Sequence, residues 1–330
     1  MTLAFTSFTS DCLCKHSSEL ALLKRMPLCE TSKGDCSQTI AAVGGRSWER
    51  DLGVAEVVCP DGKPLFVFRD NYLLGEPFYR LIREGLTDET PFTAQEKRFY
   101  RGVLKEVADF EAARGRTLQL GGVKGDVETL LAKLDLRGEC FTNEDLWDYC
   151  YSREVFATLA GRPMAKKRNF CRRFEKNRPN GRFVYWTEAP DAETIERLKA
   201  FLARWYEENQ PLDETLFFER KFLDVVLCHW NDYEITGGML VDGDEILGLT
   251  LGAPVTKSIY AVHIEKSLRG VDGAYPYLAH SLAKALPEQY AVLNREEDLG
   301  VPGLRKAKHD WSPLYQLEKG VFEIEPFTVE

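Results

Sequence analysis

The sequence contains few of the patterns that identify metal enzymes. Its five histidines and nine cysteines form no CxxC pair, no HxxxH or HExxH motif and no other spacing typical of zinc ligands. An odd number of cysteines, spread along 330 residues, also argues against a disulfide framework. We therefore expect reduced thiols and no metal centre.

Long apolar runs and targeting signals are missing as well. No window approaches the roughly 18 apolar residues that a membrane-spanning helix needs, and the N-terminal residues lack the basic start and apolar core of a secretory signal. The GxGxxG dinucleotide fingerprint and the P-loop lysine pattern are absent too. The sequence predicts a soluble, cytoplasmic protein whose contact with a membrane is at most peripheral.

Basic residues are concentrated in one segment of an otherwise acidic chain. The formal net charge is -9, yet residues 162–182 contain nine lysines and arginines and one acid, Glu175. The segment includes Lys166, Lys167 and Arg168. Such a cluster is typical of an anion-binding face, although a solvated helix that pairs with acids elsewhere is the alternative.

The order of the expected elements repeats along the chain. Apolar β-formers flank an Asp-Gly pair at 57–68 and again at 239–252, which predicts two hairpins with type I′ turns. A helix, a short strand and a second helix are expected after each, at 94–115, 117–123 and 126–134, and at 273–286, 290–296 and 303–309. This order predicts two copies of one unit, each a mixed sheet covered by helices. Because identity between the copies is negligible, a coincidence of common elements is the alternative.

The remaining second-half elements follow from periodicity and composition. We expect helices at 164–177, 192–207 and 218–230, strands at 182–186 and 258–267, and a final strand pair near 315–325.

Residues 265–286 predict a strand that passes through a glycine-containing turn into a helix. Such a turn presents unpaired backbone N–H groups and the positive end of the helix dipole, which suit a phosphate. Arg269 adds a cation, Gly270 and Gly273 allow close approach, and Ala274 and Tyr275 begin the helix. An ordinary turn is the alternative.

Residues 294–313 mix acids and cations at the tip of a predicted strand, where αβ sheets commonly bind ligands. Asn294 and Glu296 share one strand face. Glu296 and Asp298 are candidates to hold a substrate ammonium or to take its proton. Arg305 is expected to pair with these acids or with a donor phosphate. A salt-bridge cluster that only ties strand to helix is the alternative.

Two further positions belong to the same hypothesis. Lys308 follows Arg305 at helical spacing and shares its face. His263, with Glu265, lies on one face of the 258–267 strand and is a candidate base, whereas a buried, satisfied histidine is the alternative. No triad of nucleophile, histidine and acid is apparent, so catalysis is expected to rest on orientation and on backbone N–H stabilisation of an oxyanion.

Several of these stretches resemble known families. Residues 269–274, Arg-Gly-Val-Asp-Gly-Ala, resemble the coenzyme A cradle of the acetyltransferase-like (GNAT) fold, with Asp272 at a position where that family has glycine. The stretches 145–149, 159–169, 294–300, 303–308 and 311–313 resemble the soluble catalytic domain of phosphatidylglycerol lysyltransferases. The resemblance implies two tandem GNAT-like domains of class α/β (α+β), a degenerate one at 1–157 and one carrying the site at 158–330.

The resemblance also implies a function. An activated acyl or aminoacyl group would move from aminoacyl-tRNA or acyl-CoA to an amine or hydroxyl acceptor, with no other cofactor, and the basic 162–178 segment would meet the tRNA. The turn at 269–275 and the acids at 294–308 would then have to face one cavity. The rival hypothesis is a non-catalytic protein that binds or senses an amino acid or nucleotide. The donor would lie at Arg269, Gly270, Gly273, Ala274 and Tyr275, catalysis at Glu296, Asp298 and Arg305, and substrate at Asn294, Lys308, His263, Lys166, Lys167 and Arg168.

Overall fold

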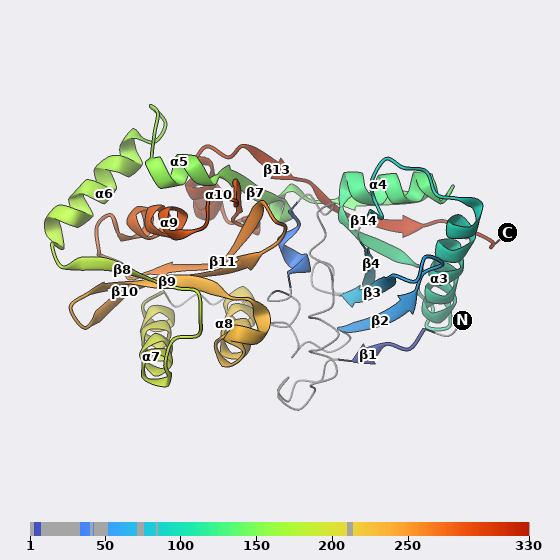
Figure 1. Ribbon diagram of the computed structural model, residues 1–330, viewed down its shortest axis with the longest axis horizontal. Coiled ribbons are helices and arrows are strands. Elements are labelled where there is room, and N and C mark those ends of the chain that lie inside the picture. The colour runs from blue at the N-terminus through green and yellow to red at the C-terminus, as the bar shows by residue number, and fades with distance from the viewer. Residues whose placement is uncertain are drawn as a thin grey trace. The chain divides into compact units, whose positions relative to one another are not determined.

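The computed structural model describes residues 3–7, 34–39, 42, 52–70, 76–83, 85–209 and 214–329. The chain forms two compact units, the first from Met1–Asp35, Ser47–Asp148 and Leu317–Glu330, the second from Cys36–Arg46 and Tyr149–Gln316. Each unit contains one seven-stranded sheet with parallel and antiparallel pairs (Figure 1). The predicted α/β class, two mixed sheets covered by helices, is confirmed.

The sheet of the first unit has the strand order β1-β2-β3-β4-β5-β14-β6. Its strands are β1 (Thr6–Ser7), β2 (Gly53–Val58), β3 (Pro64–Asp70), β4 (Phe78–Ile82), β5 (Gln119–Val123), β6 (Gly138–Thr142) and β14 (Lys319–Ile324). Its helices are α3 (Ala94–Ala112) and α4 (Lys124–Lys133), with a short 3-10 helix at Glu144–Leu146. Along α3, Tyr100, Val103, Leu104 and Val107 recur at helical spacing and are buried in the core against the sheet, since this face is the apolar one.

The sheet of the second unit has the order β13-β7-β12-β11-β10-β9-β8. Its strands are β7 (Asp148–Ser152), β8 (Gly181–Trp186), β9 (Thr236–Asp242), β10 (Glu245–Pro254), β11 (Ile259–Ser267), β12 (Val292–Asn294) and β13 (Tyr315–Leu317). Among the described residues its helices include α5 (Arg153–Thr158), α6 (Ala165–Asn177), α7 (Ala192–Asn209), α8 (Glu214–Cys228), α9 (Ala274–Ala285) and α10 (Pro302–His309), with 3-10 turns at Cys36–Gln38 and Trp230–Tyr233.

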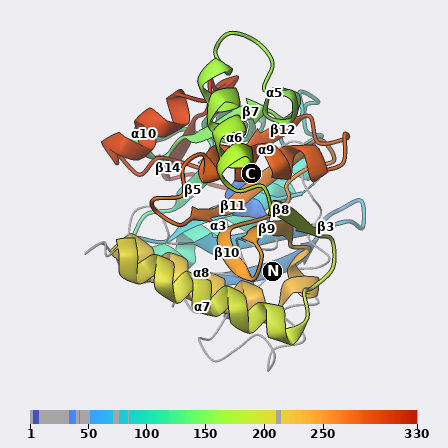
Figure 2. The same ribbon diagram turned by 90° about the vertical axis from the view of Figure 1, so that its left-hand side faces the viewer.

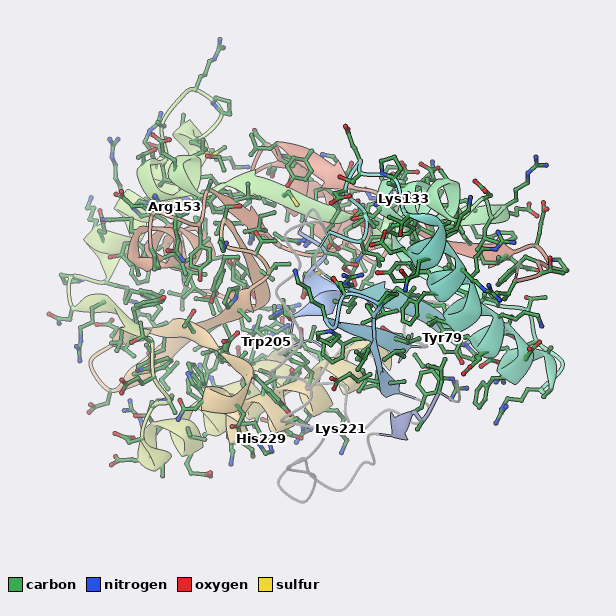
Figure 3. All side chains as sticks on the ribbon, turned by 45° about the vertical axis from the view of Figure 1, so that its right-hand side comes forward. Tyr79, Lys133, Arg153, Trp205, Lys221 and His229 are labelled. Atoms are coloured by element: carbon green, nitrogen blue, oxygen red, sulfur yellow. The ribbon has the colours of Figure 1, made fainter. Side chains whose placement is uncertain are left out.

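Helices cover both faces of the second sheet. Figures 1 and 2 show α5, α6 and α9 on one face and α7 and α8 on the other. The α7 residues Leu198, Phe201, Leu202 and Trp205 are buried at helical spacing, as the periodicity predicts. Trp205, labelled in Figure 3, donates its indole N–H to the Ser267 carbonyl at 2.9 Å, so α7 is fastened to the end of β11.

The predicted repetition of elements is present. The first unit runs β2-β3-β4-α3-β5-α4 and the second runs β9-β10-β11-α9-β12-α10, and in each the helix connects two parallel strands. The next strand in each sheet comes from the other half of the chain, because β14 pairs with β5 and β7 pairs with β12. The units therefore differ from a simple division at 157/158. Two strands form near 315–325, as predicted, but they do not pair with each other, since β13 and β14 belong to different sheets.

Both predicted hairpins form, but their turns differ from the prediction. Residues of β9 and β10 pair up to Asp242 and Glu245, so the two-residue loop is Gly243 and Asp244. In the first unit the N–H of Cys59 donates to the carbonyl of Lys63 at 2.9 Å, which leaves a three-residue loop. Only the glycine of each Asp-Gly pair has a positive φ, so a type I′ turn, which needs two such residues, does not form at either pair.

The described cysteines agree with the prediction of reduced thiols. Cys36, Cys59, Cys140, Cys150, Cys171 and Cys228 are all free. The other three, Cys12, Cys14 and Cys29, lie outside the described residues.

Candidate functional site

The candidate site lies where β11 and β12 part. β12 pairs with β11 along Ile259–Ala261, and beyond this point β11 continues to Ser267 while β12 ends at Asn294. The buried Asn294 side chain accepts the Glu296 N–H at 2.8 Å, and Glu296 adopts a left-handed φ of 60°. This conformation is unfavourable for a residue with a Cβ, so the asparagine turn holds Glu296 in a direction that an extended strand would not give it.

Glu296 points at His263. Its Oε1 lies 2.7 Å from Nδ1 of His263, and the side chains are 32% and 3% exposed respectively. The ring of Phe222, on α8, packs 5.9 Å from the imidazole between centroids. The predicted candidates Glu296 and His263 are therefore brought together as a carboxylate–imidazole pair, and only the carboxylate has substantial contact with solvent.

Asp298 is fully buried and serves as an anchor. Its carboxylate accepts Nε and Nη2 of Arg305 at 2.7 and 2.9 Å, the Tyr149 hydroxyl at 2.6 Å and the Gly300 N–H at 2.9 Å. Burial acts to raise the pKa of Asp298, but the hydrogen bonds from Arg305, Tyr149 and Gly300 outweigh it and lower this pKa to about 2. A carboxylate with so low a pKa and so many partners is a poor proton acceptor, so the geometry favours the salt-bridge interpretation for Asp298 and Arg305.

Lys308 holds the backbone of the same turn. Its ammonium, on a side chain that is 8% exposed, donates to the carbonyl of Glu296 at 3.1 Å and to the carbonyl of Arg295. It also lies 5.6 Å from the centre of the Tyr149 ring. The α10 residues Arg305 and Lys308, predicted to share a face, thus both fasten the turn that carries Glu296.

Arg295 is a site residue that the sequence reasoning missed. Its Nη2 donates to Glu265 at 2.5 Å, so it bridges β12 and β11 beyond their last paired residues. Its guanidinium lies 5.3 to 5.7 Å from the ring centres of Tyr151, Phe156 and Trp311. The sequence did contain a signal for it. Side chains alternate between the two faces of a strand, so Arg295 points to the face opposite to that of Asn294 and Glu296.

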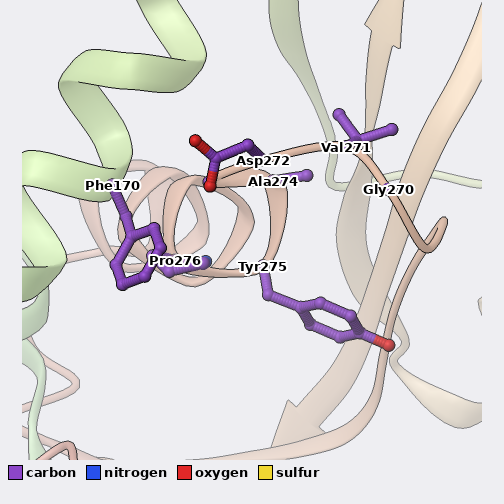
Figure 4. A pocket seen from close by; sticks show the side chains of 8 residues that line it. Phe170, Gly270, Val271, Asp272, Ala274, Tyr275 and Pro276 are labelled. Carbon is purple, nitrogen blue, oxygen red and sulfur yellow. The ribbon is translucent and has the colours of Figure 1, made fainter.

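The predicted donor turn lines a pocket of its own. Residues 270–276 and Phe170 of α6 surround an open pocket of about 370 Å³ (Figure 4). Gly273 precedes α9 with a φ of 81°, and no side chain caps this helix start. Asp272 forms an ion pair with Arg173 at 2.8 Å. Figure 4 shows the Tyr275 ring pointing away from the Asp272 carboxylate.

The pocket and the turn at Glu296 are distinct places in the described structure. Gly270, Gly273, Ala274 and Tyr275 line the pocket, whereas Arg269 and residues 294–308 are not among its lining residues. The two places are joined by β11, which runs from His263 to the turn after Ser267. At about 3.3 Å per residue, this part of the strand spans roughly 13 Å. The sequence predicted one cavity shared by the turn at 269–275 and the acids at 294–308. This pocket is not that cavity, because residues 294–308 do not line it.

The basic segment 162–178, predicted to bind a polyanion, exposes fewer of its cations than its sequence suggests. Lys167 is 9% exposed and lies 4.6 Å from the centre of the Trp311 ring, and burial lowers its pKa. Arg168 donates to the carbonyls of Leu159 and Gly161. Of the three predicted residues, Lys166 is the one that the structure leaves exposed. The other exposed basic residues of the segment 162–178 are Arg162, Arg172, Arg173 and Lys176.

Comparison with known families and structures identifies the relatives of this chain. Residues 89–319 match the family model described as phosphatidylglycerol lysyltransferase, C-terminal. The chain belongs to this family. The resemblance noted in the sequence is thereby confirmed for most of the chain, including β11, β12, α9 and α10. A comparison with curated proteins gave no match.

Three solved structures are similar to this family member. A conserved protein of unknown function from Bacteroides thetaiotaomicron is 26% identical with a TM-score of 0.78, covering 98% of this chain and 100% of its own. The C-terminal domain of a putative lysylphosphatidylglycerol synthetase from Agrobacterium fabrum is 12% identical with a TM-score of 0.60, and L-PGS from Bacillus licheniformis is 14% identical with a TM-score of 0.58. Each of the last two covers 94% of this chain and 93% of its own. At these identities the likeness concerns the fold alone.

The described helices also bear on membrane contact. None of them is both long and apolar enough to cross a bilayer.

Proposed function

We propose that the protein transfers an activated acyl or aminoacyl group to an amine or hydroxyl acceptor at the site formed by Glu296 and His263. The observation that carries the proposal is the 2.7 Å pair between these side chains, at the point where β11 and β12 part. An amine must lose a proton before it attacks an ester or thioester. Glu296 is suited to accept that proton, because it is partly exposed while His263 fixes one of its oxygens.

The surroundings of Glu296 support this role through rigidity. Asn294, Lys308 and the Asp298–Arg305 pair all hold the turn by hydrogen bonds. A base that is held in place loses little free energy to reorganisation when the acceptor binds. Family membership supports a transfer reaction as the chemistry for which this rigidity is used.

The pocket at 270–276 is the proposed place for phosphate of the donor. The positive end of the helix dipole at the uncapped start of α9 favours an anion, and the ion pair with Arg173 offsets the repulsion that Asp272 would exert on it. A donor anchored there would have to extend along β11 to reach Glu296, so a donor with a long arm between phosphate and acyl group suits the spacing. Acyl-CoA and aminoacyl-tRNA remain the two candidate donors.

The experiment is a transfer assay with both donors. Purified protein is incubated with bulk tRNA charged with labelled amino acids, or with labelled acetyl-CoA, together with a panel of amines and hydroxyl compounds, and products are identified by mass spectrometry. We expect transfer from one donor class. Thermal stabilisation by a ligand without any turnover would contradict the proposal and favour the binding or sensing protein instead.

The tRNA version has its own test. If the exposed face of α6 contacts tRNA, affinity falls steeply with salt concentration, and Lys166→Glu weakens binding and lowers the salt dependence. Lys199→Glu on α7 makes the same charge change at another exposed lysine and serves as the control. Affinity that is independent of salt, or equal loss in both variants, would exclude this face as the contact.

A further inference from the structure

A third side chain completes the pair of Glu296 and His263. Thr39, in the short Cys36–Arg46 segment of the second unit, places its hydroxyl oxygen 3.0 Å from Nε2 of His263. Thr39 is 1% exposed, and the N–H of Ala42 donates to the same hydroxyl oxygen at 2.9 Å. Thr39 lies outside the residues that match the family model, and nothing in its local sequence marks it as a site residue.

With Glu296 ionised and His263 neutral, each hydrogen bond in this chain has one direction. An ionised Glu296 can only accept, so Nδ1 of His263 carries the proton that lies between them. In a neutral imidazole Nε2 then holds a lone pair, and the Thr39 hydroxyl is the donor to it. The Ala42 N–H fills an acceptor position on the hydroxyl oxygen, which leaves its proton directed at His263.

We propose that Thr39 is a nucleophile activated by His263 and Glu296, and that transfer passes through an acyl ester on Thr39. The proposal rests on the transfer function above and specifies its chemistry. A hydroxyl whose proton points at an imidazole, with a carboxylate behind that imidazole, is the arrangement by which serine and threonine are activated. Both nitrogens of His263 are engaged, so the proton that His263 is placed to accept is the one on Thr39.

The chemical steps balance with the donor and acceptor alone. The Thr39 oxygen bonds to the donor's carbonyl carbon while its proton moves to Nε2 of His263. The bond from that carbon to the donor's leaving oxygen or sulfur breaks, and His263 returns the proton to the leaving group. The acceptor then attacks the Thr39 ester and gives a proton to Nε2 of His263, the carbon–oxygen bond to Thr39 breaks, and His263 returns that proton to the Thr39 oxygen. An acceptor that enters as an ammonium first loses one proton to Glu296.

The burial of Thr39 fits an intermediate that must survive. Water competes with any acceptor for an ester on the enzyme, and a side chain with 1% exposure is shielded from it. The ring of Phe222 packs against the imidazole of His263, whose side chain is 3% exposed. The exposed part of the site is Glu296, at the opposite end of the hydrogen-bonded chain.

The test is covalent labelling of the full chain with p-nitrophenyl acetate, a small activated ester, and in parallel with an alkyl fluorophosphonate. Intact mass and peptide mapping locate the label. We expect stoichiometric modification of Thr39, retained in Thr39→Ser, lost in Thr39→Val and slowed at least about 100-fold in His263→Gln. Thr250→Val is the matched control and should label like wild type, because Thr250 is equally buried and its hydroxyl has no hydrogen-bond partner among the described residues.

The outcomes separate this inference from the proposed function. Transfer activity that persists in Thr39→Val, with no label on Thr39 in the wild type, means direct transfer to the acceptor and overturns the inference alone. A labelled Thr39 without transfer from any donor to any acceptor upholds the nucleophile and overturns the transferase function. Label confined to lysines or cysteines, at the same level in Thr39→Val, also overturns the inference.

Discussion

The two units share one order of strands and helices, but two strand-to-helix connections in this order differ between them. In the first unit Thr93 and Glu96 form a capping box at the start of α3, so side chains of the unit itself satisfy the first N–H groups of the helix. In the second unit α9 starts at Gly273 without a side-chain cap. The helix start at this junction is thus capped by side chains in the first unit and has no side-chain cap in the second.

The second junction shows the same contrast. In the first unit β5 ends at Val123 and α4 begins at the next residue, Lys124. In the second unit residues 295–301 separate β12 from α10 and include Glu296 and Asp298. The longer connection gives room for the left-handed turn at Glu296 and for the buried Asp298–Arg305 ion pair.

The largest expected difference between the units is the effect of a substitution on transfer activity. In the transfer assay Glu296→Gln should lower kcat/KM by roughly 10² to 10⁴, since the acceptor loses its base and His263 loses its charged partner. Glu128→Gln is the control, because Glu128 is exposed on α4, the corresponding helix of the first unit. Equal rates in wild type and Glu296→Gln would refute the assignment of the site to the second unit.

Both units bury a carboxylate, which allows a matched test of stability. Arg305 pairs with Asp298, and Arg116 pairs with Glu111, with both arginine side chains 31% exposed. Arg305→Ala should cost about 3 kcal/mol in unfolding free energy, because it strips both strong donors from a fully buried anion. Arg116→Ala should cost less, since a second guanidinium, that of Arg69, remains 3.7 Å from Glu111, whereas Arg305→Ala leaves Asp298 with the neutral donors Tyr149 and Gly300. Urea unfolding measures both, and a larger loss in Arg116→Ala would reverse the comparison.

The pKa of Asp298 predicts a loss of stability in acid. Its folded value of about 2 lies below the ordinary value of 3.8, so the charged form stabilises the fold at pH values above 3.8. This contribution, about 2 kcal/mol, should disappear as the pH falls from 4 to 2. The measurement is the unfolding free energy against pH for wild type and Asp298→Asn. Identical slopes in the two proteins would contradict the prediction, and the exposed Asp310→Asn should change the slope less.

The close approach of α6 to the start of α9 can be tested by replacing two glycines, Gly270 and Gly273. Gly270 and Gly273 both have a positive φ, so an alanine at either position should cost about 1 kcal/mol. A Cβ on Gly273 would lie 2.2 Å from the Phe170 carbonyl oxygen, whereas one on Gly270 meets nothing within 4 Å. Gly273→Ala should therefore cost about 1 to 3 kcal/mol more in thermal or urea unfolding. Equal costs would show that α6 and α9 are not held together at this point.

The smallest effect belongs to the closed helix start of the first unit. Thr93→Ala removes the side-chain acceptor for the Glu96 N–H and should lower the unfolding free energy by about 1 kcal/mol. Thr90→Ala, in the exposed residues just before the cap, is the control and should be nearly neutral. A loss well above 1 kcal/mol would mean that Thr93 has partners beyond the capping box.

Local pattern was sufficient for most of the elements and for part of the site. The apolar spacing in α3 and α7 and the glycines of both hairpin turns were readable because each reflects contacts a few residues apart. The pairing of Arg305 with Asp298 was one of the interpretations open from sequence, since the two lie seven residues apart. Lys167 shows where prediction from local pattern ends. Its ammonium lies against the ring of Trp311, a residue far along the chain whose position the local sequence does not give.

By itself, the sequence determined the order of strands and helices, their repetition and the family, because these depend on periodicity, turn residues and motifs along a continuous stretch. Tertiary structure alone decided that β7 and β14 each join the sheet of the other half of the chain, and that Thr39, His263 and Glu296 meet. The physical reason is that strand pairing and side-chain hydrogen bonds join residues far apart in the chain. Which of many possible partners meet is settled only when each sheet buries its apolar faces.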